Sequence, residues 1–244
     1  MINKKLIVYG DSFADSNFEP ELWDSTRHWF HHLVEHFSGK PYEQPLLMQK
    51  VDDYDYLNRG TTGTSTFYSL CKFLDDLNVY NIEKVVFLFS APRRTPLKDG
   101  PLSAFVFDDH SAKEEVDRLN RDRQRADRHL RKLQQLQISA WYSYFLNEEP
   151  IIQFIHQSIF DRVQLECKKR NIDLVFVECM ASIYDTIQLD FGNLEYPIVR
   201  NLEIVSRSEC PDGVYAVLAG GDNRSGHMNS INNKLCADEI IKCF

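Results

Sequence analysis

Short apolar runs alternate with amphipathic stretches along most of this chain, and the alternation predicts an α/β fold. The clearest runs have the length and composition of buried parallel strands, and they lie at residues 6–9, 84–89 and 173–177. Weaker strands are expected at residues 51–58 and 198–205. Apolar residues at i, i+3 and i+4 spacing predict helices at residues 67–77, 151–169 and 231–241, and another from about Asp24–Thr26 to Phe37. Because helices and strands alternate, a mainly parallel sheet covered by helices is the expected architecture.

The first strand ends in Gly10-Asp11-Ser12, which puts a serine just beyond its carboxyl end. Ligands of open α/β sheets bind outside the carboxyl ends of the strands, so Ser12 is a candidate nucleophile. A serine hydroxyl becomes an effective nucleophile only when a base removes its proton. A catalytic role for Ser12 therefore requires a histidine, a group that orients this histidine, and N–H donors for the oxyanion.

Two later segments offer such groups. Residues 58–66 read Asn-Arg-Gly-Thr-Thr-Gly-Thr-Ser-Thr and lead into a helix. In this segment Gly60 and Gly63 allow backbone amides to approach a ligand closely. His227 stands just before the last predicted helix. Each segment taken alone also fits an ordinary turn into a helix with no catalytic role.

Taken together, Gly10-Asp11-Ser12, the glycine turn and His227 resemble the SGNH (GDSL) hydrolase family. The resemblance implies a three-layer α/β/α fold with a flavodoxin-like, mainly parallel sheet. It also implies that Ser12 is the nucleophile, that His227 is the base, and that the amides of Ser12 and Gly63 hold the oxyanion. The stretch from Asn58 to Gly63 has the Asn-x-x-x-x-Gly spacing of the family's second motif, and Asn58 is included with Gly63 among the candidate oxyanion or substrate-binding residues. No metal or organic cofactor is implied.

The family's third motif, usually Gly-x-Asn-Asp after the central strand, is replaced here by Ser90-Ala91-Pro92-Arg93-Arg94. The asparagine that acts as a third oxyanion donor is therefore absent, and losing such a donor costs about 10²–10³ in turnover. The variant is similar to phage-associated and bacterial GDSL-like proteins in which a Ser or Thr and a nearby arginine follow this strand. Ser90 and one of the two arginines, Arg93 or Arg94, are the candidates to replace the asparagine at the substrate.

The group that orients the base also departs from the family's usual Asp-x-x-His. Arg224 stands three residues before His227, and the nearest carboxylate, Asp222, stands five residues before it. Asp222 orients the imidazole if its glycine-flanked loop folds back. The alternative is a dyad of Ser12 and His227 assisted by a backbone carbonyl, which would slow the reaction without changing its class.

Residues from about 97 to 149 are rich in charged side chains and resemble a helical insertion in a single domain that spans residues 1–244. Within this region, residues 113–137 follow a seven-residue repeat with a narrow apolar seam. The pattern fits either a solvated helix or an arm through which two copies of the chain associate.

Charge and hydropathy exclude several classes of partner. The chain has 28 basic and 36 acidic residues and a formal net charge of −8, which argues against nucleic-acid binding. No apolar run approaches the length of a membrane span, so no membrane partner is expected. Met-Ile-Asn-Lys-Lys leads directly into the first strand without the apolar region of an export signal. We therefore expect a cytoplasmic protein, or one of the host cytoplasm or the virion if the source is viral.

Cysteines and histidines give no metal-binding pattern. The 6 cysteines are scattered without a C-x-x-C pair, which predicts reduced structural thiols. His28, His32 and His36 fall four residues apart on one helix face, but no acidic or cysteine partner stands at metal-ligand spacing. We interpret this row of histidines as a solvated helix face.

The sequence predicts a serine esterase that acts on a small-molecule or carbohydrate ester through an acyl-serine intermediate. Acetyl esters on a carbohydrate are the first candidate substrates, by family analogy alone. Two alternatives stay open. One is a catalytically weak or inactive structural or binding protein with the same fold, for example in a virus particle, and the other is an acyltransferase with a sugar or thiol acceptor.

Overall fold

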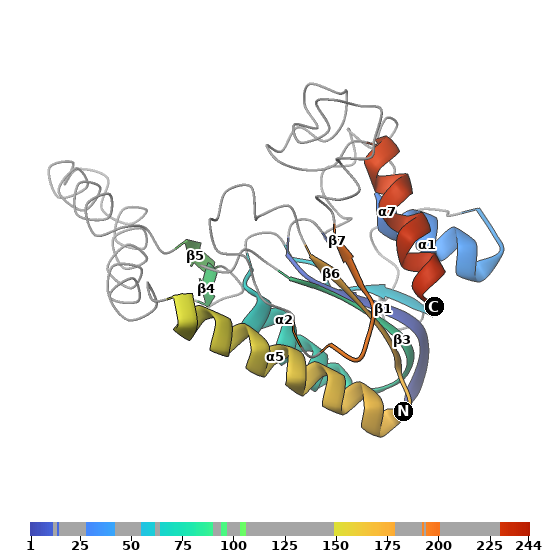
Figure 1. The fold of residues 1–244 in the computed structure, drawn as a ribbon. Helices are drawn as coiled ribbons and strands as arrows, with labels where there is room; N and C mark the ends of the chain where they lie inside the picture. Colours follow the sequence, from blue (N-terminus) through green and yellow to red (C-terminus); the bar gives the residue numbers. More distant parts are fainter. Residues whose placement is uncertain are drawn as a thin grey trace, which may run out of the picture.

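A parallel sheet of five strands forms the centre of this computed structural model (Figure 1). The strands are β1 (Ile2–Tyr9), β2 (Tyr56–Asn58), β3 (Tyr80–Phe89), β6 (Asp173–Glu178) and β7 (Ile198–Arg200). They lie in the order β2-β1-β3-β6-β7, and each neighbouring pair is parallel. The structure describes residues 1–11, 14, 28–41, 55–61, 64–89, 94–96, 103–105, 149–178, 192, 194–200 and 230–244.

The strand order is that of the flavodoxin-like folds. From β1 the chain moves to one side of the sheet to form β2, and it then crosses back to form β3 on the other side of β1. The order of the strands therefore reverses between β1 and β3, and in such sheets ligands bind beyond the carboxyl ends of the strands at this point. Tyr9, the last residue of β1, pairs with Phe87 near the end of β3, so both strands end at the same edge.

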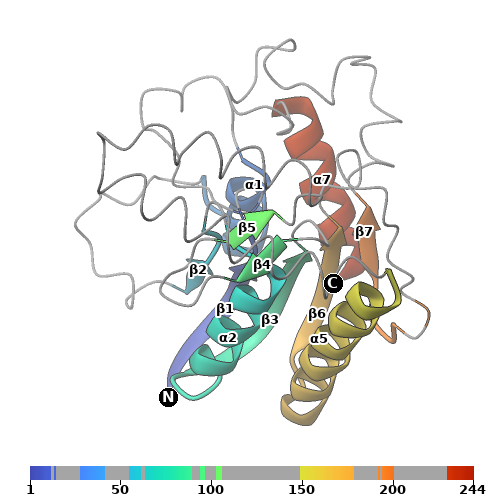
Figure 2. The same cartoon turned by 90° about the vertical axis from the view of Figure 1, so that its left-hand side faces the viewer.

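Helices cover both faces of the sheet and complete three layers (Figures 1 and 2). Helices α1 (Trp29–Ser38) and α7 (Ser230–Cys243) lie on one face. Helices α2 (Thr66–Asp76) and α5 (Glu149–Arg170) lie on the other. The predicted three-layer α/β/α architecture with a flavodoxin-like parallel sheet is confirmed.

Two apolar layers explain why the central strands read as continuous apolar runs. Alternate residues of a strand point to opposite faces, and here both faces are buried. In β1, Leu6 and Val8 pack in the layer beneath α1 and α7, whereas Ile7 and Tyr9 pack in the layer beneath α2 and α5. All four residues are fully buried. The run that predicted β1 is therefore a direct result of its position inside the sheet.

The beginning of α1 differs from its predicted position. The predicted helix starts near Asp24–Thr26, which lie outside the described residues, but α1 begins at Trp29 and has His28 as its N-cap. The imidazole Nδ1 of His28 accepts the N–H of Phe30 at 3.2 Å, as a Ser or Asp oxygen would do. The prediction that His28, His32 and His36 form a solvated helix face is also wrong in part. The side chain of His32 is largely buried, and its Nδ1 lies 3.8 Å from Oε2 of Glu35.

Two short strands that the sequence did not suggest lie just before and within the insertion expected at residues 97–149. Strand β4 (Arg94–Pro96) pairs antiparallel with β5 (Ser103–Phe105) and contacts α2. The helix expected at residues 113–137 lies outside the described residues. Likewise, β2 spans Tyr56–Asn58, a shorter segment than the predicted strand at residues 51–58, of which residues 51–54 are not described.

Cys71, Cys167, Cys236 and Cys243 are free thiols, as predicted for the described part of the chain. Cys167 and Cys236 are fully buried, and burial raises the pKa of Cys167 to about 12. Among the helices of the described residues, none combines the length and the apolar character needed to cross a bilayer.

Candidate active site

The candidate site lies where β1 and β2 end, beside the point at which the strand order reverses. Gly10 follows β1 in a position that leaves no room for a side chain. A Cβ added at Gly10 would lie 2.7 Å from Cβ of Ala14 and 2.9 Å from Cβ of Leu88, which belongs to β3. Glycine is required here because the backbone approaches its neighbours so closely.

A tight turn follows Gly10. Asp11 is fully buried, and its backbone carbonyl accepts the N–H of Ala14 at 3.0 Å. Ala14 is fully buried as well. Ser12 and Phe13, the two residues between them in the sequence, lie outside the described residues. The chain that carries the candidate nucleophile is thus fixed at both of its ends.

The segment after β2 is hydrogen-bonded to this turn through its backbone. The N–H of Arg59 donates to the carbonyl of Val8 at 2.7 Å, and the N–H of Thr61 donates to the carbonyl of Gly10 at 3.1 Å. The hydroxyl of Thr64 donates to the carbonyl of Thr61 at 2.8 Å and lies 3.4 Å from that of Gly10. Ser65 then caps α2 by accepting the N–H of Tyr68.

Asn58, the last residue of β2, connects the same two segments through its side chain. Its Nδ2 donates to the carbonyl of Ala14 at 2.7 Å, and its Oδ1 accepts the N–H of Gly60, also at 2.7 Å. The second bond is an Asx turn, in which an asparagine side chain binds the backbone two residues further on. The loops after β1 and β2 are therefore joined by backbone and side-chain bonds together.

A buried ionic network supports both loops from the α2 side of the sheet. Asp76, near the end of α2, accepts two hydrogen bonds from the Arg59 guanidinium, each at 3.0 Å, and one from the Tyr9 hydroxyl at 3.0 Å. Arg59 also donates to the Tyr80 hydroxyl at 3.3 Å. Tyr9 directly precedes Gly10 and Arg59 directly follows Asn58, so one carboxylate anchors the start of both loops.

The network should make stability depend on pH in the alkaline range. Burial raises the pKa of Tyr9 well above its ordinary value, and the Asp76 carboxylate raises it further. Below pH 10 the hydroxyl is protonated in both states, whereas above this pH the unfolded chain releases the proton first. We therefore expect Tyr9 to lower the free energy of unfolding by up to about 1.4 kcal/mol per pH unit above pH 10.

The measurement is guanidinium unfolding of the wild type and Tyr9→Phe between pH 8 and pH 11. The difference in free energy of unfolding between the two proteins should stay constant up to about pH 9 and should then shift in favour of the variant. Titration of the other tyrosines cancels in this difference. Parallel curves above pH 10 would contradict the role assigned to Tyr9.

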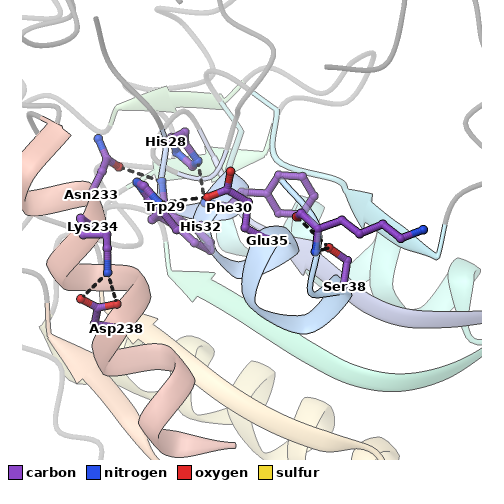
Figure 3. A network of polar contacts seen from close by, with 10 residues as sticks. His28, Trp29, Phe30, His32, Glu35, Ser38, Asn233, Lys234 and Asp238 are labelled. Atoms are coloured by element: carbon purple, nitrogen blue, oxygen red, sulfur yellow. Dashed lines mark hydrogen bonds and ion pairs between the residues drawn. The ribbon is translucent and has the colours of Figure 1, made fainter. Parts of the chain in front are cut away.

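Helices α1 and α7 run opposite to the strands, so that both begin toward the carboxyl edge of the sheet. At their far ends, Phe37 and the terminal Phe244 pack edge to face, and both rings contact the ammonium of Lys84 in the first half of β3. At their beginnings, Asn233 of α7 accepts the N–H of Trp29 of α1 at 3.2 Å (Figure 3).

This contact provides a cap for α1 that comes from another helix. The first N–H groups of a helix have no partner within the helix. The Trp29 N–H uses the side chain of Asn233, and the Phe30 N–H uses that of His28 (Figure 3). Asn233 lies in the first turns of α7, the helix that follows His227 in the sequence. The start of α7 is therefore tied to α1.

Of the residues predicted for catalysis or substrate binding, the described part of the chain includes Asn58 and Arg94. Asn58 ends β2 with its amide between two backbone groups, and Arg94 begins β4, where the backbone alone is described. The remaining candidates lie outside the described residues, namely Ser12, Gly63, Ser90, Asp222 and His227. Their catalytic roles stay predictions.

Residues outside the motifs also hold the loops of the candidate site, and the sequence did not predict them. Thr64 and Asp76 gave no signal, because a threonine in a turn and an acidic residue late in a helix are ordinary. Asn58-Arg59-Gly60 carried a usable signal, since asparagine two residues before glycine favours an Asx turn. Within the described residues, no three potential metal ligands lie close together.

No family model matches the chain, and no curated protein matches its sequence. Among solved structures, the chain is similar to a crystal structure of an acetyl xylan esterase, AlAXEase, with 13% sequence identity and a TM-score of 0.44. The match covers 98% of each chain. With an identity and a TM-score this low, the function is inferred from this chain's own residues.

Proposed function

We propose that this protein is a serine hydrolase of the SGNH type that cleaves carboxylic esters through an acyl-serine intermediate. One observation carries the proposal. The Gly10–Ala14 turn and the loop from Asn58 to Thr64 are hydrogen-bonded to each other beside the point where the strand order reverses. In the sequence these two segments contain Ser12 and Gly63. The family resemblance assigns the role of nucleophile to Ser12 and that of an oxyanion donor to Gly63.

Ser12 attacks the carbonyl carbon of the ester through Oγ while His227 takes the hydroxyl proton. The tetrahedral intermediate collapses, the acyl group stays on Ser12, and the leaving alcohol receives the proton from His227. A water molecule then attacks the acyl carbon while His227 takes its proton, and the second tetrahedral intermediate collapses. The carboxylic acid is released, and His227 returns the proton to Oγ of Ser12. The negative oxygen of each intermediate is bound by the amides of Ser12 and Gly63, and Asp222 orients the imidazole.

The third oxyanion donor of this proposal comes from the segment after β3. Ser90 and Arg94 take the place of the asparagine that the family usually has there. Arg94 opens the β4–β5 hairpin, which follows β3 in the chain and contacts α2. An arginine would supply a charged donor to the oxyanion, a stronger interaction than that of a neutral amide.

The proposed substrate is an O-acetyl ester on a carbohydrate. This choice rests on the family resemblance, and the net charge of −8 adds that a polyanionic substrate is disfavoured. A catalytically inactive scaffold is the second candidate, and the missing asparagine favours it. Transfer of the acyl group to an acceptor is recognised by a change in product ratio when acceptor alcohols are added.

Covalent labelling tests the proposal. A fluorophosphonate reacts when a serine oxygen attacks phosphorus and fluoride leaves, and this reaction requires an activated serine. We expect one label per chain, on the peptide that contains Ser12, located by mass spectrometry. Absence of label on Ser12 in the folded protein would overturn the hydrolase proposal and favour the scaffold.

A further inference from the structure

The side chain of Asn58 links the turn that carries the candidate nucleophile to the loop that carries the second oxyanion donor. We propose that Asn58 is a positioning residue, which sets the distance between these two loops without touching the substrate. The inference rests on the proposed hydrolase function. It gives Asn58 a role different from the direct substrate contact expected from the sequence.

Two hydrogen bonds of the Asn58 side chain are short, and together they use both ends of its amide. The Nδ2 group reaches across to the Ala14 carbonyl at 2.7 Å, and Oδ1 accepts the Gly60 N–H at 2.7 Å within its own loop. A rigid planar amide between two backbone groups holds both at a fixed separation. Ala14 lies two residues after Ser12, and Gly60 lies three residues before Gly63.

Ala14 is the point at which the turn can be held. Its N–H is used by the Asp11 carbonyl, and its side chain fills the space beside Gly10 that a Cβ would need. Ala14 is completely buried, so the donor from Asn58 satisfies a carbonyl that lies out of contact with bulk solvent. A buried carbonyl that loses its donor is costly, and the turn would be expected to move to recover a partner.

A movement of this kind would affect catalysis more than folding. The backbone bonds from Thr61 to Gly10 and from Arg59 to Val8 remain when Asn58 is replaced, so the sheet and α2 keep their places. The amide near Ser12 and the amide near Gly63 must point at one oxygen atom, and a misplacement of about 1 Å costs on the order of 10²-fold.

Two substitutions separate the bonds. Asn58→Asp keeps the acceptor for the Gly60 N–H but sets a carboxylate oxygen against the Ala14 carbonyl, and Asn58→Ala removes both bonds. Asn78→Asp is the matched control, because Asn78 also donates from Nδ2 to a carbonyl, that of Leu74 at 3.1 Å, in an exposed position after α2. We would measure p-nitrophenyl acetate hydrolysis, the fluorophosphonate labelling rate, thermal midpoints, and hydrogen exchange of peptides that cover residues 10–14.

We expect kcat and the labelling rate to fall between about tenfold and a hundredfold in both Asn58 variants, with KM unchanged. Exchange of residues 10–14 should become faster in both, whereas Asn78→Asp should match the wild type. Wild-type kcat and wild-type labelling in folded Asn58→Asp would overturn the positioning role while leaving the hydrolase proposal intact. A wild-type protein that is not labelled would overturn the hydrolase proposal itself, and the positioning role of Asn58 with it.

Discussion

Replacing Ser12 or His227 with alanine is expected to lower kcat for p-nitrophenyl acetate by on the order of 10⁴- to 10⁶-fold, the scale known from serine proteases. The two side chains act as one unit, because the hydroxyl needs the base and the base has no task without the hydroxyl. The double variant should therefore be no slower than either single variant. Losses that multiply in the double variant would show that Ser12 and His227 act in separate steps.

The size of the loss at Asp222 distinguishes a triad from a dyad. Asp222→Asn should lower kcat by less than His227→Ala does, because the acid orients the imidazole and does not itself accept the proton. Asp75→Asn provides the control, since Asp75 is an exposed aspartate on α2. Wild-type kcat in Asp222→Asn would assign the orienting role to a backbone carbonyl, as in the dyad.

Asp76→Ala is expected to lower the free energy of unfolding by about 3 kcal/mol or more. The substitution removes the carboxylate that accepts hydrogen bonds from both Arg59 and Tyr9. It leaves a guanidinium that is 28% exposed and a hydroxyl in a fully buried ring without this acceptor. The partial exposure of Arg59 puts the expected loss at the lower end of the range for broken buried ion pairs. For a chain of 244 residues, the thermal midpoint should fall by roughly 6–12 °C.

The neighbouring aspartate makes the prediction for Asp76 specific. Asp75→Ala changes the same residue type one position earlier on α2, but on the exposed side of the helix, and it should shift the midpoint little. Calorimetry of both variants gives the comparison. Equal midpoints for Asp75→Ala and Asp76→Ala would contradict the importance assigned to the ionic network.

The central strands could be predicted because a strand that is buried on both faces of the sheet requires apolar residues at consecutive positions. The start of α1 could not, since its caps are an imidazole and the side chain of Asn233 from the other end of the chain. The β4–β5 hairpin was missed for a different reason. Each of its strands has three residues, too few for alternation of apolar and polar positions to be recognised.

For the candidate site, the motifs directed attention to the loops after β1 and β2 but gave no indication of the bonds that join these loops. Gly10 was expected to end a strand, and the structure adds that Leu88 of another strand forbids a larger residue there. Asn58 was noted for its spacing from Gly63. Its bond to Ala14 depends on β2 lying beside β1, which no local pattern specifies.

The sequence by itself determined the layered α/β architecture and the order of the candidate catalytic residues, because apolar periodicity and short motifs are local properties of the chain. The tertiary structure alone decided which side chains hold the loops at the carboxyl edge. Asn58, Asp76 and Asn233 each bind a backbone or a charge brought close by folding. Such hydrogen bonds join segments that are remote in the sequence, and no local preference encodes a partner at that distance.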